Sequence, residues 1–167
     1  MLISSGSPTR SLLTFGLLLC GLLFAAAPGW AGGQSTVSGI FKGNGKDTRL
    51  AHVSAAKGEP LAGKPTILLV FTEKDHSKDD RPQIKATFGG FGSALIVTID
   101  ESGDIVGCEV AHAAHEKQGF SSIGKVNLTD FKRTPGVIQG RLTTNGEVKT
   151  FGEKWELDLK FNAALPK

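Results

Sequence analysis

The sequence predicts an all-β fold, mainly antiparallel, arranged as a single-domain β-sandwich or β-barrel of about eight strands with one or two short helical turns. Two observations support this. From Thr36 onward apolar and polar residues alternate, which is the period of a strand with one buried face. Glycine, proline, asparagine and aspartate also recur at short intervals, as expected of the turns between short strands.

A signal-peptide helix is predicted to precede this domain. Arg10 is the single charged residue of the first 31 positions, and an apolar run follows over residues 12–27. The run is shorter than the roughly 20 residues that a membrane-spanning helix needs, and Pro28 ends it. Small residues then suit cleavage near Ala31, so we expect a secreted or periplasmic protein with no stable membrane span after cleavage.

These boundaries give three parts: a signal peptide at 1–31, a flexible lead-in at 32–35 and the β domain at 36–167. Two alternatives to simple cleavage are open. Cys20 follows three leucines and could carry a lipid, although Leu19 is a large residue before a processed cysteine. The leader could also stay uncleaved as an anchor.

The middle strands are predicted from continuous apolar runs. Residues 65–71 contain five consecutive large apolar side chains, and 94–99 are nearly as apolar, so both are expected to be strands buried on two faces. The polar loop 100–104 then separates residues 95–99 from 105–110, which is a hairpin pattern.

The C-terminal part contains the clearest strand. Residues 154–163 alternate strictly, which puts Trp155 and Leu157 on one face with Leu159 and Phe161, and charged side chains on the other. Upstream of it, Asn145 and Gly146 suit positive φ angles and predict a second hairpin turn.

Two short segments are predicted to be helical turns. The first is 82–88, preceded by Asp79 and Asp80 as capping residues and followed by a glycine. The second is 111–118, which is rich in alanine and is also followed by a glycine.

Composition narrows the classes of partner. The net charge is +3 for the whole chain, and removal of Arg10 with the leader leaves a nearly neutral domain, so we expect no nucleic acid partner. Cys20 leaves with the leader, which makes Cys108 the only thiol and excludes an intrachain disulfide. Asn127 begins an acceptor sequence for a glycan, which matters only in a eukaryotic secretory pathway.

The densest group of chemically active side chains is Cys108, His112 and His115. Thiolate and imidazole are the usual ligands of zinc and copper, so these three are the candidate metal ligands. In a helix they would share one face, whereas a strand would place Cys108 and His112 on one face and His115 on the other. The alternative is a Cys108 that fills the core and binds nothing.

The function predicted from these patterns is that of an exported, non-catalytic binding or structural module, whose partner is a protein or a small ligand. The first alternative is a zinc- or copper-binding protein that uses Cys108, His112 and His115. The second is a cysteine-dependent hydrolase with Cys108 as nucleophile. The sequence contains no set of acid, base and nucleophile at a recognisable spacing, so catalysis is not the expectation.

Overall fold

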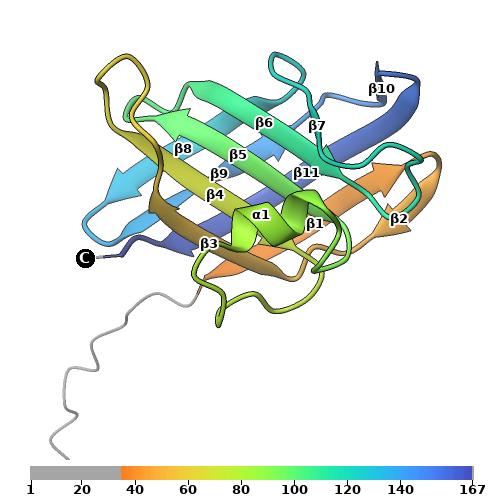
Figure 1. Ribbon diagram of the computed structural model, residues 1–167. Coiled ribbons are helices and arrows are strands. Elements are labelled where there is room, and N and C mark those ends of the chain that lie inside the picture. Colours follow the sequence, from red (N-terminus) through yellow and green to blue (C-terminus); the bar gives the residue numbers. More distant parts are fainter. Residues whose placement is uncertain (1–34, 167) are drawn as a thin grey trace, which may run out of the picture. The chain divides into compact units, whose positions relative to one another are not determined.

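A computed structural model describes residues 35–166 and contains two antiparallel β-sheets stacked as the two layers of a sandwich (Figure 1). The predicted signal peptide and nearly all of the predicted lead-in lie outside the described residues. Sheet A has the order β2-β1-β11-β9-β8, with β10 also paired to β11, and sheet B has the order β3-β4-β5-β6-β7. The strands are β1 (Thr36–Gly43), β2 (Lys46–Thr48), β3 (His52–Lys57), β4 (Thr66–Thr72), β5 (Ala94–Asp100), β6 (Ile105–Ala111), β7 (Phe120–Ser121), β8 (Asn127–Thr134), β9 (Val137–Thr143), β10 (Val148–Thr150) and β11 (Glu153–Ala164).

The all-β prediction is confirmed, and of the two architectures left open the structure has the sandwich. The core lies between the sheets and takes the inward side chains of both. Strand β11 alternates buried and more exposed positions along its length, as predicted from its sequence, and it pairs with β1 on one side and with β9 and β10 on the other. Several strands are only two or three residues long, which is why about eight were expected and eleven are present.

Strands β4 and β5 are buried on both faces, also as predicted. Their inner face meets sheet A, and part of their outer face is covered by the helix α1 (Pro82–Thr87), which lies against sheet B (Figure 1). A small second core forms under this helix from Val70, Ala86, Ala94, Ile96 and Ala111. Continuous apolar runs in β4 and β5 therefore reflect two packed faces.

Helix α1 confirms the first predicted helical turn, but its cap differs from the prediction. Arg81 is the N-cap and makes no side-chain capping hydrogen bond, while the Asp79 carboxylate accepts a hydrogen bond from the Arg81 N–H at 3.1 Å. The second predicted helical turn, 111–118, is wrong. Strand β6 continues through Ala111, and the chain then crosses to β7 in turns that bury His112 and His115.

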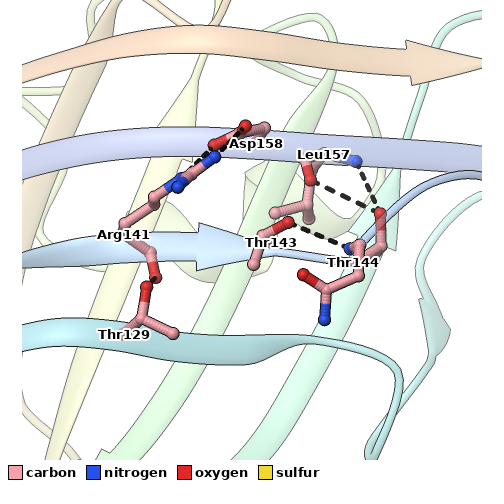
Figure 2. Close-up of polar contacts among 7 residues, drawn as sticks. Thr129, Arg141, Thr143, Thr144, Leu157 and Asp158 are labelled. Atoms are coloured by element: carbon pink, nitrogen blue, oxygen red, sulfur yellow. Dashed lines mark hydrogen bonds and ion pairs between the residues drawn. The ribbon is translucent and has the colours of Figure 1, made fainter.

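The turn at Asn145 and Gly146 has the predicted positive φ angles of 56° and 111°, but it does not join a hairpin. Strands β9 and β10 both run antiparallel to β11 and pair with it. The segment between them therefore interrupts the pairing with β11 without reversing the direction of the chain. The Thr144 hydroxyl bridges the interruption, because it accepts the Leu157 N–H at 3.1 Å and donates to the Gly146 carbonyl at 2.7 Å. Figure 2 shows the contact between Thr144 and Leu157.

The same sheet carries a bidentate ion pair on its outer face. Arg141 on β9 donates from Nε and Nη2 to the two carboxylate oxygens of Asp158 on β11, at 2.7 and 2.6 Å (Figure 2). The hydrogen bonds from Arg141 lower the pKa of Asp158. Within residues 35–166 no helix is long and apolar enough to cross a membrane.

Candidate functional site

Cys108 lies in the core between the sheets and not at a surface. It is on β6, opposite Val97 of β5, and its side chain belongs to the same inner cluster as that of Val110. Burial, with a smaller effect from Glu109, raises the pKa of the thiol to about 12. The thiol is therefore protonated at neutral pH, which makes it a poor nucleophile.

His112 and His115 come together just beyond the end of β6. Both are buried, and their ring centroids are 5.2 Å apart. His112 continues the inward alternation of Cys108 and Val110, but four residues of strand separate it from the thiol by about 13 Å along the chain. The structure thus brings together two of the three predicted ligands and places Cys108 elsewhere.

Hydrogen bonds fix which nitrogen of each ring carries the proton. His112 Nδ1 accepts the Ala114 N–H at 3.1 Å, so the neutral ring is protonated at Nε2. His115 Nε2 lies 3.0 Å from the Lys154 carbonyl oxygen, which can only accept, so this ring carries its proton on Nε2 and leaves Nδ1 bare. Among the described residues neither His112 Nε2 nor His115 Nδ1 has a partner.

This protonation pattern bears on metal binding. A metal ion needs a free lone pair on each imidazole, and in this arrangement only His115 Nδ1 offers one, since the His112 lone pair receives the Ala114 N–H. In the part of the chain that the structure describes, no group of three or more His, Cys, Asp or Glu side chains is placed to hold a metal ion. A zinc or copper ion at Cys108, His112 and His115 stays a prediction.

Gly43, at the end of β1, is what allows the two rings to pack here. A Cβ atom at this position would lie 2.4 Å from Cγ of His112 and 2.7 Å from Nε2 of His115, both far inside contact distance. Aromatic rings close the rest of the site, with Phe41 edge-on to His112 at 5.1 Å and Phe120 next to His115 at 5.4 Å. The pair is therefore enclosed by apolar groups on several sides.

A half-buried, hydrogen-bonded carboxylate lies near His112. Glu73 accepts hydrogen bonds from the Thr48 hydroxyl and from the backbone N–H of Ser93. Burial raises the pKa of Glu73, but these hydrogen bonds outweigh it and leave the pKa below its ordinary value. Burial, together with His115, lowers the pKa of His112, and the charges of Glu73 and Asp47 only partly oppose that effect.

His76 is a third buried histidine, on the other side of sheet B. Its Nδ1 donates to the Thr72 hydroxyl at 2.6 Å, because that hydroxyl already donates to the Lys74 carbonyl, and its Nε2 accepts from the Ser54 hydroxyl at 2.7 Å. Burial, and secondly the proximity of His52, lower the pKa of His76. The folded protein therefore keeps both His76 and His112 neutral more strongly than the unfolded chain does.

Acid is expected to destabilise the protein through His76 and His112. Their pKa values are lowered in the folded state from an ordinary value of 6.5, so below pH 6.5 the unfolded chain binds more protons. The free energy of unfolding should fall as the pH drops from 6.5 toward the lowered pKa values. The slope of this fall is set by the extra protons that the unfolded chain binds, up to one for each histidine. Urea unfolding at pH 7.5, 6.5 and 5.5 measures this, and His76→Gln or His112→Gln should flatten the slope. A stability that rises between pH 6.5 and 5.5 contradicts the assignment.

A hollow of about 430 Å³ opens at one end of the sandwich, and we call it the end hollow. It lies where the connection between β3 and β4, the turn after β5, the end of β8 and the C-terminal residues meet. Its apolar lining includes Ala56, Pro60, Pro65, Ile67, Leu165 and Pro166, and its polar lining includes Lys57, Thr66, Glu101 and Arg133.

Neither a family model, nor a curated protein, nor a solved structure matches this chain. Sequence patterns did not single out the polar residues of the end hollow. Lys57 ends strand β3, Glu101 lies in the turn after β5, and Arg133 lies near the end of β8. Arg133 belongs to sheet A and the other two to sheet B, so only the stacking of the two sheets brings them together, and no local spacing could have indicated them.

Proposed function

We propose that this protein is an exported, non-catalytic binding module whose end hollow takes a small amphipathic ligand, an apolar body that carries one anionic group. The observation that carries the proposal is the end hollow itself. Its volume of about 430 Å³ falls in the range of small-molecule sites, and most of its lining is apolar. Export follows from the predicted leader.

Charge supports an anionic group on the ligand. Lys57 and Arg133 are the cations of the lining and Glu101 is its one acid, so one positive charge is left over. Arg133 Nη1 lies 3.4 Å from the Glu101 carboxylate, and both side chains are well exposed. A pair of this kind contributes little to stability, so a ligand carboxylate can replace Glu101 on the guanidinium at small cost.

The chemistry of the buried groups supports binding rather than catalysis. The Cys108 thiol, with its pKa near 12, is buried in the core. His112 and His115 are likewise enclosed, so a substrate would have no approach to a nucleophile and base at these positions.

The experiment is a titration of the purified protein with decanoate, followed by backbone amide NMR shifts. We expect shift changes confined to residues around the end hollow, and about fivefold weaker binding by Arg133→Ala, which corresponds to loss of one partly exposed ion pair. Decanol, with the same chain and no charge, should bind more weakly than decanoate. Ala56→Trp should block the hollow and abolish the changes.

Arg141→Ala is the matched control, because Arg141 is exposed to nearly the same extent as Arg133, 41% against 43%, and is also paired with an acid. It lies on the outer face of sheet A and should leave decanoate binding unchanged. Absence of shift changes up to millimolar decanoate, or equal loss of binding in the Arg133 and Arg141 variants, would overturn the proposal.

A further inference from the structure

The outer face of sheet B carries a groove beside α1, and at one end the groove adjoins the end hollow, with which it shares Lys57, Gly58 and Thr66. Two adjoining hollows of about 310 and 360 Å³ form it, and they share four lining residues. Gly107 on β6 and Thr98 opposite it on β5 are two of these, and Leu68 and Gln83 are the others. Because Gly107 has no side chain, the sheet face is open at this point. We call this feature the α1 groove.

Large apolar side chains are exposed along the rim of the α1 groove. Leu61, Ile84 and Phe88 line it and are 54%, 47% and 78% exposed. They make up half of the six exposed large hydrophobic residues in the described part of the chain. Ile84 and Phe88 are four residues apart at the helix, so they project from the same side of α1. Gathered apolar exposure of this kind marks an interaction surface.

The charged side chains that line the groove are Lys57, Glu59 and Glu109, so the opposite charges nearly cancel. Lys85 pairs with Asp79, and the Glu109 carboxylate accepts the Thr87 hydroxyl at 2.7 Å. The lining therefore carries little net charge that would select an oppositely charged partner or repel a surface identical to itself.

We propose that the occupant of the α1 groove is a second copy of this chain, in a two-fold symmetric dimer. A two-fold interface requires that the same surface carry both the projection and the cavity that receives it. Phe88 is such a projection, and it stands at the rim of a hollow of about 310 Å³ floored by Leu68 and Ile96. In the dimer each Phe88 ring fills the groove of the other copy and buries the rim residues of both.

Sedimentation velocity of the purified protein from 5 to 200 μM tests the proposal. We expect the mass to rise from one toward two copies with concentration. Phe88→Asp should weaken association at least tenfold, since it puts a charge into an apolar contact, and Ile84→Asp should do the same from the neighbouring position. Circular dichroism melting checks that each variant is folded.

Phe151→Asp is the matched control, because Phe151 is 65% exposed and lies in the turn between β10 and β11, away from the groove lining. It should associate like the unchanged protein. A chain that stays monomeric up to 200 μM overturns the proposal and leaves the groove to a different partner. Association that survives in both the Phe88 and the Ile84 variants overturns it as well.

Discussion

Replacing Trp155 with alanine is expected to lower the free energy of unfolding by about 3–5 kcal/mol, the usual cost of truncating a buried tryptophan. Trp155 is fully buried in the core on β11, and its indole N–H donates to the Thr150 hydroxyl at 3.2 Å. Its partner on β1 is Gly43, which has no side chain to move into the vacated space. On that side no side chain can fill the cavity, whereas on the other side Val148, the partner of Trp155 on β10, packs against the same core.

Urea unfolding followed by far-UV circular dichroism measures this loss without relying on tryptophan fluorescence. Trp155→Phe is the matched variant, because it keeps an aromatic ring in the core and removes the hydrogen bond to Thr150. This variant should lower the free energy of unfolding clearly less than Trp155→Ala does. A loss below about 1 kcal/mol for the alanine variant would mean that the core around Trp155 is not packed as described.

Gly43→Ala is expected to cost about 2–3 kcal/mol, although it adds only one methyl group. The new Cβ would lie 2.4 Å from the His112 ring and 2.7 Å from the His115 ring. Neither ring can move aside freely, because the His112 ring accepts a hydrogen bond from the Ala114 N–H and the His115 ring donates one to the Lys154 carbonyl. Steric overlap must then be relieved by a shift of β1 or by loss of these hydrogen bonds.

A double-mutant cycle isolates this clash from other effects of alanine. In a His112→Ala background the same Gly43→Ala change should cost clearly less, because the closer of the two overlapping rings is gone and only the overlap with His115 is left. Gly45→Ala is the control, since a Cβ there meets nothing within 4 Å and its cost comes from a φ of +78° alone. That cost should be the same with and without the His112 ring. Equal costs of Gly43→Ala in both backgrounds would exclude the clash.

The elements that the sequence predicts well are those whose burial is decided within a few residues. The alternation in β11 and the apolar runs in β4 and β5 follow from one or two packed faces, and a local pattern is enough to reveal them. The segment after Ala111 has helix-favouring alanines, yet it is too short to form a stable helix without packing. Burial of His112 and His115 against β1 decides its path instead.

The candidate site was predicted only in part, because contacts between distant segments decide where its residues lie. The spacing of Cys108, His112 and His115 converges on one point in a helix, but β6 is a strand, so Cys108 points into the core at a distance from the histidines. The end hollow and the α1 groove depend on pairings between distant strands. Nothing in the sequence around Arg133 indicates that it lies near Lys57, and nothing around Phe88 indicates that it lies beside Gly107.

The position of β11 in sheet A also has a consequence for the order in which the protein can be made. Among the described strands it is synthesised last, yet it pairs with the first of them, β1, and holds β9 and β10 along its other edge. Until residues 153–164 are synthesised, β1 and β9 have no common partner and sheet A cannot close. Sheet A can therefore form completely only after residues 153–164 have been made, whereas every strand of sheet B is present once Ser121 has been added.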